Sequence, residues 1–249
     1  MHALMPQRVV LHVHCVNTLA HAVQADPEAV LAEKLSGLHW ALIPYRRPGL
    51  PLAEAIMAHK SEQTDVLILG NHGLVVAAES VAQAEALLET VVARLTLPER
   101  AAEVAVDAQH LAGLAAGSGF RPAAELRTHQ LAFDALGTAF ATPLPLYPDH
   151  VVFLGPGAVV ADSPSAAQNA LQVHRYAGVS AVKMLIVPQT GVFVSEQAGD
   201  GADAMALCLS DVARRIPAGG VLNYLSEQDL GQLLNWDAEQ YRMGLNKSC

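Results

Sequence analysis

Short apolar runs alternate along the chain with longer segments in which apolar residues recur every three or four positions. The short runs predict strands, and the longer periodic segments predict helices with one apolar face. In the first part of the chain the pattern predicts strands at residues 9–13, 39–45, 65–69 and 74–78, and helices at residues 17–25, 27–35, 52–60 and 80–95. This alternation predicts an α/β fold.

Two of these helices begin with residues that suit a helix start. Asp26 and Pro27 are favourable residues for the N-cap and the first helical position of the second helix. Ser80 is followed three residues later by Gln83, which is the spacing of a capping box. The helix that begins at Ser80 has an apolar stripe made of Val81, Ala84, Leu88, Val91 and Leu95.

The second part of the chain begins with an alanine-rich stretch at residues 98–140, which predicts a mostly helical connection. Strands are then expected on both sides of the glycine turn within residues 150–161, with His150 at the start of the first strand. Two more strands are expected within residues 182–195, and helices at residues 163–178 and 201–216.

The two parts of the chain contain similar segments, which are candidates for an internal repeat. Residues 65–95 and 182–216 share an apolar strand, a turn with glycine, a second apolar strand and a long helix that ends near arginine. Gly73 corresponds to Gly191, whereas His72 corresponds to Thr190. Any chemistry at this turn therefore belongs to the first copy. Many unrelated strand–turn–strand–helix units share this pattern, so a repeat and a coincidence are equally open.

Composition excludes several classes of protein. The chain has 249 residues, which is enough for one large domain or two modest ones with a substantial core. No apolar run approaches the roughly 18–20 residues that a membrane helix requires. The first ten residues lack the pattern of a secretory signal, so we expect a cytoplasmic protein.

Charge and cysteine spacing exclude two further classes. The net charge of −9 is spread along the chain, and Arg46–Arg47 and Arg214–Arg215 are too short to follow a nucleic acid backbone. Cys15, Cys208 and Cys249 have neither zinc-finger spacing nor the even number of a disulfide framework. We therefore expect a small-molecule partner and neither nucleic acid nor membrane.

The main candidate for chemistry is a group of histidines. His12 and His14 are two positions apart in a predicted strand, so their side chains point to the same face, while Cys15 faces the other way. Two neighbouring imidazoles can bind one metal ion, and a catalytic zinc ion takes a third protein ligand. His72 is the leading candidate for that ligand because Gly70 and Gly73 flank it and allow a sharp turn.

Other interpretations of these residues are weaker. Paired histidines in a strand are often half-buried groups that bond to the backbone, and eleven histidines allow many accidental trios. Surface, capping or packing roles are predicted for His2, His21, His39, His59, His110, His129, His150 and His174. A cysteine nucleophile at Cys15 fails because it faces away from His14. The stretch GPGAVVA lacks the full glycine fingerprint of a nicotinamide site.

Three stretches in the same order, HVHCVNTLAHAV, IPYRRPGLPLAEAI and LGNHGLVVAAESVAQAEALLE, resemble the class II aldolase/adducin family, which includes fuculose and rhamnulose phosphate aldolases. The resemblance implies a three-layer α/β/α sandwich with a mixed, largely antiparallel central sheet in residues 1–97. Residues 98–140 are then the helical connection, and residues 141–249 resemble the smaller α/β extension of longer bacterial members.

The resemblance also implies a site and an activity. The metal ligands of the family correspond to His12, His14 and His72, which would hold zinc or another divalent metal. The implied protein is a metal-dependent aldolase-like lyase that cleaves or forms a carbon–carbon bond in a sugar phosphate or related hydroxy-carbonyl compound. A homo-oligomer, dimer or tetramer, is implied as well. A sugar-phosphate 4-epimerase and a non-catalytic, adducin-like assembly domain are the alternatives.

One part of the family pattern is missing. Family members carry a glycine-rich phosphate-binding region and an acidic residue for proton transfer before a segment similar to MHALMP, and here that segment begins at Met1. We therefore expect the acidic residue to lie upstream of Met1 and name no catalytic acid or base. Such a truncated chain is expected to bind metal with weak or no turnover.

Overall fold

The computed structural model describes residues 2–100, 105–166 and 182–234, and the chain forms two compact units. The first unit comprises Met1–Pro98 together with Gly219–Asn223, and the second comprises Glu99–Ala218 together with Tyr224–Cys249. The first unit therefore includes a short segment that is far away in the sequence.

A four-stranded sheet in the order β1-β4-β3-β2 forms the centre of the first unit. The β1–β4 and β4–β3 pairs are antiparallel, whereas β3 and β2 are parallel. The strands are β1 (Val9–Val13), β2 (Trp40–Ile43), β3 (Val66–Leu69) and β4 (Gly73–Ala78). The helices are η1 (His2–Leu4), α1 (Val16–Ala22), α2 (Glu28–Lys34), α3 (Leu50–His59) and α4 (Val81–Arg94).

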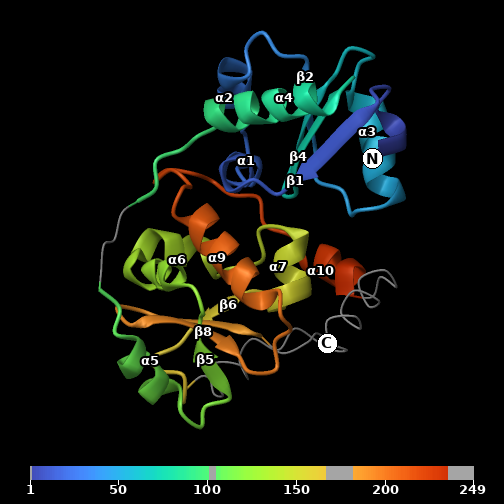
Figure 1. Ribbon diagram of the computed structural model, residues 1–249. Helices are drawn as coiled ribbons and strands as arrows, with labels where there is room; N and C mark the ends of the chain where they lie inside the picture. The colour runs from blue at the N-terminus through green and yellow to red at the C-terminus, as the bar shows by residue number, and fades with distance from the viewer. Residues whose placement is uncertain (1, 101–104, 167–181, 235–249) are drawn as a thin grey trace. The chain divides into compact units, whose positions relative to one another are not determined.

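Helices cover both faces of this sheet, as Figure 1 shows for α3 on one side and for α2 and α4 on the other. Alternate residues of β3 point to opposite faces because a strand has a period of two. Leu67 and Leu69 pack in the cluster that contains Ile56 of α3. Val66 and Ile68 pack in the cluster with α2 and α4. All four β3 residues are buried, and the three-layer expectation is confirmed for this unit.

The helix starts agree with the sequence pattern at one position and differ at another. Ser80 is the N-cap of α4, and its side chain accepts a hydrogen bond from the backbone N–H of Gln83. In contrast, α2 begins at Glu28 with Pro27 as its N-cap, and no side chain caps it. The prediction that Asp26 caps α2 is therefore wrong by one position.

The second unit is also built around a four-stranded sheet, in the order β5-β8-β7-β6. The strands are β5 (Phe120–Pro122), β6 (Ala158–Val160), β7 (Met184–Val187) and β8 (Gly191–Ser195). The helices are α5 (Ala108–Ala115), η2 (Leu126–Phe133), α6 (Ala135–Ala141), α7 (Pro148–Leu154), α9 (Ala202–Ala213) and α10 (Glu227–Leu234). In Figure 1, α5 lies on one face of the sheet and α6, α7 and α9 lie on the other.

This second unit extends over more of the chain than the sequence suggested. The stretch 98–140, predicted as a helical connection, contains α5, η2 and α6, but it also contains β5, which pairs with β8. It therefore contributes a strand to the second sheet. The second unit spans more residues than the first, so it is not a smaller addition.

One predicted strand of the second unit is a helix. The run HVVFL forms the end of α7, and His150 lies in this helix instead of at the start of a strand. Pro148 occupies the first turn, and Asp149 adds a negative charge there, which are both favourable at a helix start. The run is apolar because α7 packs against both α9 and α10, not because it belongs to a sheet.

Most of the predicted helix at residues 163–178 lies outside the described residues, as does His174. Within the described part of the chain, none of the helices has both the length and the apolar character needed to cross a membrane.

Candidate metal centre

The first two histidines of the predicted trio lie where β1 ends. His12 belongs to β1, and His14 follows the last residue of the strand, Val13. Cys15 then serves as the N-cap of α1. The chain therefore changes from strand to helix directly after His14, and both imidazoles are half-buried at this edge of the sheet.

The third histidine lies in the tight turn between β3 and β4. Asn71 adopts a left-handed conformation with φ of 52°, which asparagine tolerates better than most residues. Its backbone N–H donates to the carbonyl oxygen of Ala22, and its side-chain amide donates to the carbonyl oxygen of Asn223 at 2.7 Å. These bonds fix the turn, and His72 is only 8% exposed.

Gly73 allows this turn to lie against the end of β1. A Cβ atom at this position would lie 2.7 Å from the carbonyl oxygen of Val13 and 2.9 Å from Cδ2 of His14. Both distances are shorter than real Cβ contacts, so a side chain here would push the turn away from the two histidines. The absence of a side chain at residue 73 is a requirement of the site.

The structure brings His12, His14 and His72 together. The Nε2 atoms of His12 and His14 are 3.1 Å apart, and one ligand atom from each of the three rings lies within 4.8 Å of the others. The ring centroids are 4.9 to 5.1 Å apart, with the ring planes at 66° to 86° to one another. The rings therefore meet edge to face instead of stacking.

The distance between two of the three ligand atoms fits a tetrahedral metal ion. Two nitrogen ligands about 2.0–2.1 Å from a tetrahedral zinc ion are about 3.3 Å from each other. The 3.1 Å between the two Nε2 atoms is close to that value. The same distance also suits a hydrogen bond between two imidazoles, but such a pair does not need a third imidazole. Among the described residues, the cluster consists of the three histidines without a carboxylate.

The backbone orients one of the rings. Nδ1 of His12 lies 3.0 Å from the carbonyl oxygen of Leu74, the residue that follows Gly73. A proton on Nδ1 donated to this oxygen leaves the lone pair on Nε2, the atom that faces His14. Metal-binding histidines commonly use this arrangement, in which the second ring nitrogen is held by a hydrogen bond.

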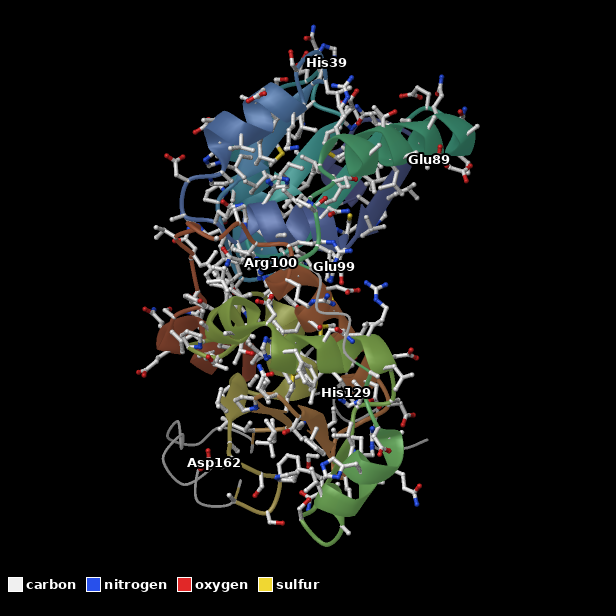
Figure 2. The ribbon with its side chains drawn as sticks, turned by 90° about the vertical axis from the view of Figure 1, so that its left-hand side faces the viewer. His39, Glu89, Glu99, Arg100, His129 and Asp162 are labelled. Carbon is white, nitrogen blue, oxygen red and sulfur yellow. The ribbon has the colours of Figure 1, made fainter. Side chains whose placement is uncertain are left out.

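The other described histidines lie elsewhere. His2, His39, His59 and His110 are exposed, and His39 is labelled in Figure 2. His21 is buried and its Nε2 lies 3.1 Å from the carbonyl oxygen of Leu95. His129 is buried and hydrogen-bonded to the backbone, and His150 is fully buried in α7. The predicted surface, capping or packing roles agree with these positions.

Sequence reasoning missed the supporting residues. The supporting role of Asn71 and the proximity of the segment Gly219–Asn223 were not predicted. The Gly-Asn-His-Gly stretch indicated a turn, and an asparagine in a turn can adopt a left-handed conformation. Nothing in the sequence indicates that residue 223, which is 152 positions away, lies beside this turn.

Comparison with known proteins gives a family match in the first part of the chain. Residues 1–106 match the class II aldolase and adducin N-terminal domain. This aldolase/adducin domain includes the whole Met1–Pro98 part of the first unit, with all three histidines. The family resemblance expected from the sequence is confirmed for these residues. No match was found among curated proteins or among solved structures.

Proposed function

We propose that the aldolase/adducin domain binds a divalent metal ion, zinc in the first instance, through His12, His14 and His72, and that the protein is a metal-dependent aldolase-like lyase. The observation that carries this proposal is the meeting of three imidazoles from the end of β1 and the β3–β4 turn, each with a ligand atom within 4.8 Å of the others. The match of residues 1–106 to the domain supports it.

The ligand count favours a catalytic ion over a structural one. Structural zinc sites are closed by four protein ligands, whereas catalytic sites keep one position for water or substrate. The described residues supply three ligands here, and His12 and His14 are only half-buried. A site with three ligands and partial solvent access can accept the oxygen atoms of a small molecule.

The proposed reaction makes or breaks a carbon–carbon bond beside a carbonyl group of a sugar phosphate or related hydroxy-carbonyl compound. When bound, the ion would supply Lewis-acid stabilisation of the negative charge that develops on the substrate oxygens. The chain's own contribution is to hold three imidazoles in a fixed arrangement. The Leu74 carbonyl oxygen and the Asn71 turn serve this purpose.

Proton transfer needs a separate group. General acid–base catalysis contributes a factor of roughly 10²–10⁴ to a rate and requires a side chain that reaches the reacting atoms. The described histidine cluster contains no carboxylate, so we assign no acid or base from this chain. The proposal therefore predicts that the protein binds the metal ion tightly and that it turns over substrate slowly.

Activity can be tested with the full chain loaded with zinc. The substrates are L-fuculose 1-phosphate, L-rhamnulose 1-phosphate and L-ribulose 5-phosphate, and the measurement is the release of aldehyde against the appearance of an epimer. We expect zinc-dependent aldehyde release that a chelator abolishes, that added zinc restores and that His72→Ala lowers at least 100-fold. His39→Ala, at an exposed histidine, is the matched control.

The outcomes separate the alternatives. An epimer without free aldehyde would favour the 4-epimerase, which uses the same bond cleavage and rejoining. A folded protein that binds no divalent metal and turns over none of these substrates would contradict the proposal and favour an adducin-like assembly domain.

A further inference from the structure

The strands of the two units pair within their own sheets in the same register. In the first unit Trp40 lies opposite Val66 in the parallel β2–β3 pair, and Val66 lies opposite Val76 in the antiparallel β3–β4 pair. In the second unit Ala158 lies opposite Met184, and Met184 lies opposite Val194. Each residue of the second set lies the same number of positions after its counterpart in the first set. The order of the strands in the two sheets is also equivalent.

The turn that carries His72 is repeated in its backbone details. Gln189 has a φ of 55°, and among the described residues only this glutamine and Asn71 have a positive φ without being glycine. The backbone N–H of Gln189 donates to Ala132, as that of Asn71 donates to Ala22. A left-handed glutamine is uncommon, so its presence at the equivalent place is not expected from a generic hairpin.

This equivalence of the strands shows which residues of the second unit correspond to His12, His14 and His72. His12 lies opposite Val75 in β1, and Pro122 lies opposite Phe193, the equivalent of Val75, in β5. Position 14 then corresponds to Ala124, and position 72 corresponds to Thr190. The second unit therefore places proline, alanine and threonine where the first unit has three imidazoles.

A different histidine lies at this place in the second unit. His129 of η2 is 1% exposed and is labelled in Figure 2. Its Nδ1 accepts the backbone N–H of Val192 at 3.0 Å, and its Nε2 lies 3.1 Å from the carbonyl oxygen of Ala123. Val192 and Ala123 are the equivalents of Leu74 and Val13, so one ring connects the same two strand ends.

Gly191 provides space for this ring, as Gly73 does for the histidines of the first unit. A Cβ atom on Gly191 would lie 3.0 Å from Nδ1 of His129. Both ring nitrogens of His129 are used by the backbone, and burial lowers its pKa. A neutral ring with both nitrogens engaged has no lone pair left for an ion.

We infer that the second unit is a diverged copy of the first, with a vestigial metal position between Pro122, Ala124 and Thr190, and that His129 connects by hydrogen bonds the strand ends beside that position. Of these two equivalent positions, only the one in the first unit accordingly takes up an ion. The statement about the number of ions depends on the proposed function, whereas the statement about the copy depends only on the backbone.

Placing three histidines at the equivalent positions of the second unit tests this inference. The full chain with Pro122→His, Ala124→His, Thr190→His and His129→Leu is dialysed against zinc alone, and its zinc content is measured with its circular dichroism. We expect two zinc ions per chain, compared with one in the wild type. A folded variant with no gain would contradict the inference. If the wild type holds no zinc, the proposed function fails, and the melting temperature of His129→Leu still tests whether His129 connects the two strand ends.

Single substitutions keep the test decisive if the fourfold variant does not fold. His129→Leu removes both backbone bonds, and we expect a lower melting temperature with an unchanged zinc content. His72→Ala, at the turn of the first unit, should do the reverse and remove the zinc. A loss of zinc in His129→Leu under conditions in which the chain stays folded would overturn the inference, because His129 would then support the ion.

Discussion

The side-chain amide of Asn71 donates a 2.7 Å hydrogen bond to the backbone carbonyl oxygen of Asn223, which is 152 residues further along the chain. Two backbone bonds accompany it, from the N–H of Ala25 to Val221 and from the N–H of Asn223 to Val23. The segment Gly219–Asn223 is in this way part of the first unit. It supports the turn that carries His72.

We predict that Asn71→Ala weakens zinc binding. The change removes the bond to Asn223 and forces alanine into a left-handed conformation that costs about 1–2 kcal/mol. We expect a tenfold or larger rise in the zinc dissociation constant, measured by competition with a chelating dye. Asn71→Gly keeps the left-handed conformation but lacks the bond to Asn223. Its zinc dissociation constant should lie between those of the wild type and Asn71→Ala.

The equivalent turn of the second unit supplies a matched control for this prediction. Gln189 has nearly the same φ as Asn71, and β-branched residues tolerate this conformation poorly, so Gln189→Val imposes a backbone cost at the equivalent turn. We expect it to lower the melting temperature and to leave the zinc dissociation constant unchanged. An equal effect of Asn71→Ala and Gln189→Val on zinc would show that general destabilisation, and not the turn that carries His72, is responsible.

We predict that Gly73→Ala disrupts the metal centre. The new methyl group would lie 2.7 Å from the carbonyl oxygen of Val13 and close to His14, so β1 and the turn must separate. Zinc content should fall below one half of the wild-type value. Gly113→Ala is the control, because a Cβ atom there meets nothing within 4 Å. In the middle of α5, it should stabilise the helix by about 0.5–1 kcal/mol.

We predict that His150 makes the protein less stable in acid. Burial lowers the pKa of this imidazole from 6.5 to about 3, and neither ring nitrogen has a hydrogen-bond partner among the described residues. The unfolded chain takes up a proton near pH 6.5, whereas the folded chain does so only near pH 3. The contribution of the neutral His150 to the free energy of unfolding is therefore fully present above pH 6.5 and decreases as the pH falls toward 3.

The measurement for this prediction is the free energy of unfolding between pH 7 and pH 4. The decrease due to His150 can reach several kcal/mol, since each unit of pKa shift corresponds to about 1.4 kcal/mol. His150→Leu should flatten the curve, while His110→Leu, at an exposed position, should leave it unchanged. His21 and His129 also have lowered pKa values and will retain part of the slope. Identical slopes for wild type and His150→Leu would contradict the assignment.

Local pattern predicted the elements of the first unit well because their signals are short-range. Val9–Val13 forms the strand that its β-branched residues favour, and the Ser80 cap begins α4 as its spacing indicates. The run HVVFL was misleading, because a helix buried between two other helices is as apolar as a strand. Its hydrophobicity alone does not distinguish the two.

The histidine trio was predictable in part. The two-residue spacing placed His12 beside His14, and the glycines beside His72 indicated a turn. That this turn reaches β1 depends on the pairing of β1 with β4, which joins residues more than 60 positions apart. The role of Asn223 depends on a still longer connection that leaves no periodic pattern in the sequence.

The most direct test of the metal centre is X-ray absorption at the zinc edge on the zinc-loaded full chain. We predict a first shell that includes three imidazole nitrogens at about 2.0–2.1 Å. The imidazole contribution should fall to two in His72→Ala and stay at three in His39→Ala. A shell dominated by sulfur, or an imidazole count that His72→Ala leaves unchanged, would contradict the assignment of His12, His14 and His72 as ligands of one ion.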